Sequence, residues 1–390
     1  MEINLSSFKK PTLLVLYVLI FVFALTSAIP AYVNSSFLKS LTNEQLVGVF
    51  YTMASILAFA SLIFIPKILQ KYGNYRVTLS LIFLYFLNFL GLAYVQNVFL
   101  VLFFFVITSS MATTIYFNLD MFLEHNSSDL VTGRIRSVYL TFLNLAWLGS
   151  PLLAGIIVGE YSYRMIYLVA ALILIPAFFI VFSSFSDFKD PDYIVVNFLE
   201  TLKNININKN IRNIWVSSFL LQLFYSWMVI YTPIYLNVYI GFSWGTIGIL
   251  FSLMLIPFIL IQIPAGYLAD KMFGEKEILV AGFLIMGIYT AMMPFITSKN
   301  FIIWAVILFS TRIGAAMVEV MNDTYFFKNV SEKDSNQISL YRTSAPLAYI
   351  ISPVIATVII YFFPISNLFF ILGLIMMFGV KYSLAIEDTK

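Results

Sequence analysis

Residues 263–276 read IPAGYLADKMFGEK, and this stretch decides the fold. It ends an apolar run, Gly245–Leu268, that is long enough to cross a bilayer as a helix, which takes about 20 residues. Charged residues follow directly, and the segment then reaches a glycine, Gly274. This change is typical of a spanning helix that has arrived at the membrane surface. It predicts that the chain is built from membrane-spanning helices.

The composition of the whole chain supports this prediction. Apolar residues make up 61% of its 390 residues and charged residues 11%, whereas soluble domains carry about 45–50% and about 25%. A soluble protein of this size has no place to bury so much apolar surface. The absence of cysteine excludes disulfides and thiolate metal sites, and His125 is the single histidine.

Twelve apolar runs of spanning length follow one another and predict an all-α, polytopic bundle of twelve helices. The runs are Thr12–Val33, Gln45–Ile65, Val77–Val95, Val98–Leu119, Ile135–Val158, Met165–Phe182, Ile214–Val238, Gly245–Leu268, Ile278–Ile296, Phe301–Met321, Ile338–Phe362 and Ile365–Ala385. The first run, which follows Lys9 and Lys10, has a signal peptide as its alternative reading. Its length favours a span.

The positions of the basic residues orient the bundle. With both termini in the cytoplasm, the cytoplasmic segments hold eighteen of the twenty-two Lys and Arg residues. Lys39, Arg164 and Lys299 fall outside, and Arg312 falls within a span. Cytoplasmic loops of membrane proteins are rich in Lys and Arg. The distribution therefore predicts an integral protein of the cell (inner) membrane, and it also supports the count of twelve spans.

The sequence divides into two halves of six spans each. The most polar stretch, Ser183–Asn213, lies near the middle of the chain. We expect an N-terminal half over residues 1–185, a cytoplasmic linker over 186–212 and a C-terminal half over 213–390. The linker is either a plain solvated segment or a short amphipathic helix that begins near Pro191.

Short motifs recur between the halves at an offset of about 200 residues. Ile65-Pro66-Lys67, with Gln70 to Gly73, matches Ile263-Pro264, with Asp270 to Gly274. Ser150-Pro151 in the fifth span matches Ser352-Pro353 in the eleventh. Several matches at one offset indicate a duplicated six-helix unit. Parallel repeats of this kind characterise a large class of secondary transporters.

The segment Gly266–Lys276 resembles the signature loop of the major facilitator superfamily, roughly G-x-L-A-D-[RK]-x-G-[RK]-[RK]. One extra residue precedes Gly274, and Glu275 replaces a basic residue. The copy in the first half is degenerate, with Gln70 in place of the acid. Residues 149–155 are similar to the Gly-Pro motif of the superfamily's antiporters, which favours export. The resemblance covers the whole topology but only about thirty residues of motif.

The resemblance implies a gate at the cytoplasmic side. A carboxylate at Asp270 is well placed to bind the N-terminus of another helix and to pair with arginine. In the family that partner is the start of the fifth helix. The alternative is a basic loop that only fixes topology. The predicted gating residues are Gly266, Asp270, Lys271, Gly274, Lys71, Gly73, Gly133, Arg134 and Arg136.

Two ionisable residues lie inside the tenth span. Arg312 is about 16 Å from the outer end of that span, at 1.5 Å per residue, and Glu319 follows two turns later on the same face. An ionisable group in mid-membrane costs about 2.5–3.5 kcal/mol or more, so it usually has a function and a partner. We expect both residues to face a polar cavity or a partner on another helix.

In the family, the first and fourth helices of each half line the cavity. The predicted substrate and ion residues are Arg312, Glu319, Tyr225, Trp227, Tyr231, Gln222, Asn118, Thr114 and Asn144. Each Ser or Thr of these helices has an alternative role, a hydrogen bond to its own backbone. Asn144, on the fifth span, either faces the cavity or packs.

Acidic residues follow the fourth and tenth spans. Asp120, Glu124 and Asp323 either form a proton relay or pair with the arginines of the cytoplasmic gate, Arg136 and Arg342 among them. We favour charge pairing. His125 is expected to be a solvated loop residue.

Together these features predict a secondary transporter of a small solute by alternating access, with proton-coupled export as the favoured mode. The alternatives are a transporter-like sensor or assembly protein and, less favoured, a membrane-embedded transferase. We expect no enzyme activity, no cofactor or metal, and no nucleic-acid partner. The expected partners are the solute, protons and the lipid bilayer, and the expected state is a monomer.

Overall fold

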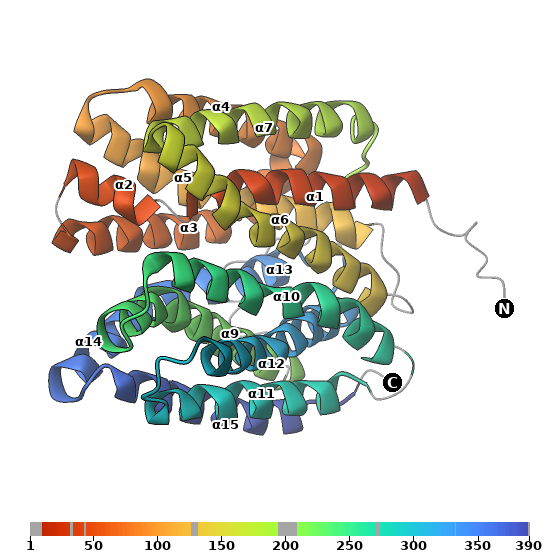
Figure 1. Ribbon diagram of the computed structural model, residues 1–390. Coiled ribbons are helices and arrows are strands. Elements are labelled where there is room, and N and C mark those ends of the chain that lie inside the picture. The colour runs from red at the N-terminus through yellow and green to blue at the C-terminus, as the bar shows by residue number, and fades with distance from the viewer. Residues whose placement is uncertain are drawn as a thin grey trace. The chain divides into compact units, whose positions relative to one another are not determined.

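A computed structural model describes residues 10–31, 34–42, 44–125, 132–193, 209–269, 271, 274–331 and 333–388. These residues form helices and contain no strand (Figure 1). The helices are α1 (Lys10–Ala31), α2 (Asn34–Leu41), α3 (Glu44–Tyr72), α4 (Asn74–Tyr94), α5 (Val98–His125), α6 (Thr132–Glu160), α7 (Tyr163–Ser184), α9 (Lys209–Ile234), η3 (Tyr235–Tyr239), α10 (Trp244–Leu268), α11 (Glu275–Met292), η5 (Met293–Phe295), α12 (Phe301–Lys328), α13 (Ser335–Arg342), α14 (Ser344–Phe362) and α15 (Ser366–Leu384).

The predicted all-α membrane fold is confirmed. Eleven helices of the described chain are long and apolar enough to cross a membrane, with α13 and α14 counted as one span. The remaining predicted span, the fifth, corresponds to α6, which lies in the predicted place and begins with Arg134 and Arg136. These helices support an integral membrane protein.

Contacts divide the chain into two compact units. The N-terminal unit comprises Met1–Ser128, Phe142–Phe198 and Ser331–Leu340, and the C-terminal unit comprises Asp129–Thr141, Leu199–Val330 and Tyr341–Lys390. Each unit therefore includes a short segment from the other half of the sequence. The segments are the starts of the fifth and eleventh spans. The linker boundaries predicted from the sequence stay a prediction, and residues 194–208 lie outside the described part of the chain.

The helices pack in the same order within each unit. In the N-terminal unit α3 packs on α5, and α4 and α1 both pack on α7. In the C-terminal unit α10 packs on α12, and α11 and α9 both pack on α15 (Figure 1). The three helix pairs of one unit have the same positions in the repeat as the three pairs of the other unit. The agreement supports the two six-helix pseudo-repeats that the sequence indicated.

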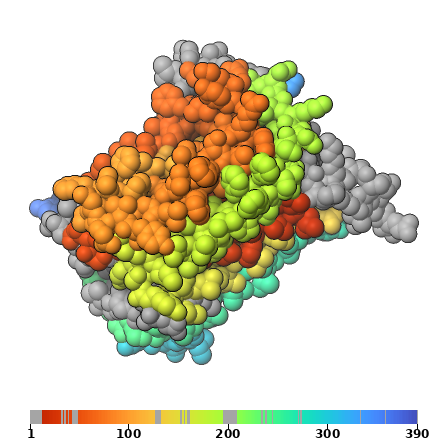
Figure 2. Space-filling model, turned by 90° about the horizontal axis from the view of Figure 1, so that it is seen from above, coloured from red at the N-terminus to blue at the C-terminus, as the bar shows by residue number. Residues whose placement is uncertain are grey.

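Apolar side chains cover the outer faces of the helices. Figure 2 shows a face of the N-terminal unit on which α4 and α7 lie. Both helices expose large apolar residues, among them Leu84 on α4 and Leu172 and Phe179 on α7. An apolar surface of this kind is unfavourable in water, whereas it is compatible with the lipid tails of a bilayer.

Glycines permit close helix packing in the C-terminal unit. A Cβ atom on Gly314 of α12 would lie 2.6 Å from the backbone nitrogen of Met286 on α11. Gly314 therefore allows the backbones of α11 and α12 to approach closely. This contact fixes α12, which carries the ionisable residues of the tenth span.

Several helices run further than the predicted spans, as α3 does when it continues to Tyr72. α5 continues to His125 and α12 to Lys328. His125 was expected in a loop, but it is the last residue of α5, and its ring lies 4.8 Å from that of Phe188. Hydropathy marks the membrane limit, whereas a helix extends as long as its backbone hydrogen bonds and packing allow.

Candidate functional site

Arg312 is buried in the middle of α12 in the C-terminal unit. Only 2% of its surface is exposed. Its guanidinium carbon lies 5.0 Å from the ring centroid of Phe224 and 5.7 Å from that of Tyr225, both on α9. Aromatic faces attract a cation, and more strongly when water is excluded. The guanidinium cannot lose its proton in a protein, so this site carries a permanent positive charge.

Glu319 supplies the opposite charge two turns along α12. Its Oε2 accepts a hydrogen bond of 2.7 Å from the Nε2 of Gln262 on α10. The Tyr225 hydroxyl lies within electrostatic reach of both Glu319 and Arg312, and Tyr349 on α14 lies within reach of Arg312. Residues from four helices of one unit thus form a single polar cluster, which we call the Arg312 cluster.

The other predicted residues of α9 divide into two groups. Trp227 is fully buried, and its Nε1 donates to the carbonyl oxygen of Ser352 at 2.8 Å. This bond, with the one between the Ser226 and Ser352 hydroxyls, joins α9 to α14. Gln222 and Tyr231 are partly exposed. They remain candidates to line a cavity, whereas Trp227 has a packing role in this structure.

The predicted residues of the N-terminal unit have contacts of their own. Asn118 is fully buried, and its Nδ2 donates to Thr78 Oγ1 on α4 at 3.0 Å. Thr114 Oγ1 donates to the carbonyl of Ser110 at 2.8 Å, which is the backbone bond foreseen as the alternative. Asn144 is partly exposed. A cavity role for these three residues stays a prediction.

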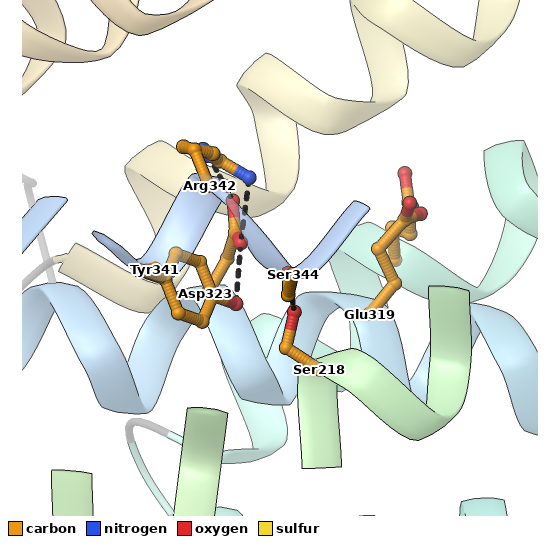
Figure 3. A network of polar contacts seen from close by, with 7 residues as sticks. Ser218, Glu319, Asp323, Tyr341, Arg342 and Ser344 are labelled. Carbon is orange, nitrogen blue, oxygen red and sulfur yellow. Dashed lines mark hydrogen bonds and ion pairs between the residues drawn. The ribbon is translucent and has the colours of Figure 1, made fainter. Parts of the chain in front are cut away.

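A charged network occupies the predicted cytoplasmic end of α12. Asp323 pairs with Arg342, with Nη2 and Oδ2 3.0 Å apart, and its Oδ1 also accepts a hydrogen bond from the Tyr341 hydroxyl at 2.9 Å (Figure 3). The charge pairing expected for Asp323 is therefore confirmed. Glu319 lies one turn away on the same helix, outside these bonds (Figure 3). The network accounts for Asp323 without a proton relay.

Arg136, at the start of α6, is fully buried in the C-terminal unit. Its guanidinium carbon lies 3.2 Å from the ring centroid of Phe327, and that of Arg342 lies 5.7 Å from the same centroid. Arg134, two residues earlier, is exposed. Of the two predicted gating arginines, only Arg136 is thus buried against α12.

The signature loop meets the start of α6. A Cβ atom on Gly266 would lie 2.7 Å from the carbonyl oxygen of Gly133 and 2.8 Å from the side chain of Ser137. Only a glycine allows α10 and α6 to approach so closely. This contact is where the sequence placed the partner of the loop. Asp270 itself lies outside the described residues.

The other predicted gating residues are two exposed lysines and the two glycines at which the loops turn. Lys271 is exposed over the Tyr267 ring, and Lys71 is exposed over the Tyr72 ring. Gly73 and Gly274 have φ values of 80° and 81°. That conformation is costly for any residue with a side chain, and it explains the glycine that follows the basic residue in each loop.

Sequence reasoning missed Gln262, Phe224 and Tyr349 as members of the Arg312 cluster. Gln262 had a signal, because it is an amide in an otherwise apolar eighth span. Phe224 and Tyr349 had none, since aromatic residues are frequent throughout the chain. The described residues contain no group of three or more His, Cys, Asp or Glu side chains that could hold a metal ion.

Comparisons with known proteins place these features in context. The sequence model of the Major Facilitator Superfamily matches residues 214–387, and no curated protein sequence matches the chain. The human organic anion transporter MFSD10 (TETRAN) has a similar structure, with a TM-score of 0.79 at 12% identity over 96% of this chain and 99% of that one. A bacterial homologue of the iron transporter ferroportin, in an outward-facing state with soaked iron, gives 0.75 at 13% identity over 95% and 97%.

At such low identity these structures show a shared fold and not a shared substrate. The family match and both neighbours point to membrane transport rather than to catalysis.

Proposed function

We propose that this chain, whose residues 214–387 match the Major Facilitator Superfamily model, is a secondary transporter that moves a small solute by alternating access. It acts as a monomer in the cell membrane, with both termini in the cytoplasm. The single observation that carries this proposal is the Arg312 cluster. A buried cation and a carboxylate in the middle of a spanning helix are costly, and a solute path is their usual reason.

The cluster has the groups that a solute site needs. Arg312 offers a guanidinium fork that matches a carboxylate or a similar anion, and the α9 aromatics form an apolar wall beside it. Glu319 is partly exposed and can take up a proton. We assign solute binding to Arg312 and proton binding to Glu319. The partly exposed Gln222 and Tyr231 extend the same face of α9.

Two contacts act as the cytoplasmic gate in this proposal. One joins Gly266 of α10 to Gly133 at the start of α6. The other is the hydrogen bond from the Ser339 hydroxyl of α13 to the Leu62 carbonyl of α3. Each contact links the two halves of the sequence. It joins the second helix of one half to the start of the fifth helix of the other half. Both contacts must break when the cytoplasmic side opens.

Alternating access is tested by the reactivity of one introduced cysteine, because the natural chain has none. Gln222→Cys should react with a membrane-impermeant maleimide from the outside in right-side-out vesicles and from the inside in inverted vesicles. Leu172→Cys, whose parent residue is 56% exposed on α7, is the matched control. It faces lipid and should react from neither side.

The same experiment separates the alternatives. A sensor or assembly protein of fixed conformation would expose Gln222→Cys to one side only, and that result would contradict transport. Metal-dependent turnover of a lipid-linked substrate by the purified protein would support a transferase instead.

A further inference from the structure

The charges inside the membrane come as one opposite pair. Among the described helices, Arg312 and Glu319 are the charged side chains that lie more than two turns from both helix ends. The other charges of the described helices lie within two turns of a helix end. The electrical state of the solute site is therefore set by these two residues together.

Only one member of the pair can change its charge. Arg312 stays protonated at any physiological pH, whereas Glu319 can be ionised or neutral. Within the C-terminal unit, the Gln262 amide and the Tyr225 and Tyr349 phenols face them. Asp323, one turn beyond Glu319, is balanced by Arg342. The α11 helix carries its charges in its first turn, Glu275–Glu277.

The charges of Arg312, Glu319 and the bound solute decide which loaded states of the site can reorient across the membrane. The empty site with Glu319 ionised is neutral. A site that holds a monovalent anion on Arg312 and a proton on Glu319 is neutral too. A site with only the proton carries one positive charge, and one with only the anion carries one negative charge. An unbalanced charge away from water is strongly disfavoured.

Resting on the transport function proposed above, we propose that the solute is an organic monoanion that crosses together with one proton, as an electroneutral symport. The anion binds the Arg312 guanidinium beside Phe224 and Tyr225, and Glu319 holds the proton. Exchange of anion against proton would require both singly loaded, charged states to reorient. Symport needs only the two neutral ones.

The inference has a consequence for direction. When the outside is more acidic than the cytoplasm, symport drives uptake of the anion. This differs from the export that the Gly149–Gly155 motif favoured, because that motif reflects a resemblance and carries no charge. The pH dependence also has a sign: anion affinity is highest when Glu319 is protonated and falls as the pH rises through the Glu319 titration.

The test uses three monosubstituted benzenes that differ in charge: benzenesulfonate, benzenesulfonamide and benzylammonium. Binding to the purified protein is measured by calorimetry between pH 5 and 9, in two buffers with different heats of ionisation. We expect benzenesulfonate to bind with uptake of about one proton and to lose up to tenfold in affinity per pH unit on the alkaline side. The neutral and cationic probes should bind at least tenfold more weakly.

Variants assign the roles. Glu319→Gln should keep benzenesulfonate binding and remove its pH dependence, because it imitates the protonated state. Arg312→Gln should abolish binding. Lys299→Gln, an exposed charge loss outside the cluster, is the control and should behave like the wild type. If Arg312→Gln fails to fold, the neutral double variant Arg312→Gln/Glu319→Gln should fold and still not bind.

Three results would overturn the inference: no binding of benzenesulfonate to the wild type, preference for benzylammonium, or proton release on anion binding. None of them affects the two-sided reactivity of Gln222→Cys. A wrong substrate class is thereby distinguished from a protein that does not transport.

Discussion

The loops that join the second and third helices of each half share a glycine turn and a capping carboxylate, and they differ in their buried chemistry. Each turns at a glycine with positive φ, Gly73 or Gly274. Each then starts a helix whose first turn is capped by a carboxylate from beyond the sixth helix of that half. Asp190 accepts from the Asn74 backbone N–H at 2.6 Å, and Asp388 from the Lys276 backbone N–H at 3.0 Å.

The difference lies in the residue that follows the glycine. Asn74 is fully buried, and its Nδ2 donates to the Asn118 carbonyl on α5 at 3.0 Å. Glu275 is also fully buried, but it forms an ion pair of 2.7 Å with Lys328 at the end of α12. An amide contact in one unit thus corresponds to a salt bridge in the other.

The comparison teaches that duplication has kept the glycine turn and the carboxylate cap of the loop, and not its buried charges. It also explains the departure of Glu275 from the family pattern, since Lys328 supplies the basic partner. The gating acid shows the same asymmetry. Gln70 stands where the other loop has Asp270, and its Nε2 donates to the Tyr193 carbonyl at 3.1 Å. The two cytoplasmic contacts should therefore differ in strength.

Breaking the ion pair should have the largest effect. Lys328→Met leaves the Glu275 carboxylate buried without its main counter-charge, which costs about 3–5 kcal/mol. Asn74→Ala, the matched change in the first loop, removes only hydrogen bonds of a neutral amide and should cost about 1–3 kcal/mol. Thermal unfolding in detergent measures both. The double variant Lys328→Met/Glu275→Gln should recover most of the loss, and failure to recover would argue against the pair.

A side chain at the close helix approach should have the next largest effect. Gly266→Val forces α10 away from Gly133 and should cost about 1–3 kcal/mol. Hydrogen exchange of residues 132–141 should become faster. Gly248→Val, on the same helix with open space around it, is the control. Ile68, the counterpart of Gly266 in the first loop, is 40% exposed, so Ile68→Val should change little. Equal effects at all three positions would contradict the contact.

Loss of the helix caps should have the smallest effect. Asp190→Asn and Asp388→Asn should each cost about 0.5–2 kcal/mol, because a charged cap at a helix N-terminus is weakened. Asp190 should cost more, since its Oδ1 also accepts from the Tyr193 hydroxyl at 2.6 Å. Thermal unfolding of the two variants side by side measures the difference. A larger loss for Asp388→Asn would reverse the comparison.

The sequence was sufficient for the spans, because a bilayer demands long apolar runs and leaves a strong signal. It also singled out Arg312 and Glu319, since charge in such a run is rare. It did not indicate the Asp190 and Asp388 caps or the Glu275–Lys328 pair. These contacts join polar segments far apart in the chain, and no periodicity connects their residues.

Residue type alone was less reliable within the site. Trp227 and Tyr225 are two positions apart on one helix, and both fitted a polar cavity lining. The structure directs the Trp227 indole to the Ser352 carbonyl and places Tyr225 beside Arg312. Packing decides which face of α9 meets α14. The sequence did not indicate this face, because the apolar residues of α9 are spread around the whole helix.

The most direct test of alternating access is a pair of distance measurements between spin labels. Ser186→Cys with Glu277→Cys reports the predicted cytoplasmic side, and Asn97→Cys with Lys299→Cys reports the outer side; all four positions are exposed. Introducing Gly266→Val weakens the cytoplasmic contact. The cytoplasmic distance should then lengthen while the outer distance shortens, with Gly248→Val leaving both unchanged. Two distances that stay fixed, or that change in the same direction, would contradict a transporter whose halves alternate.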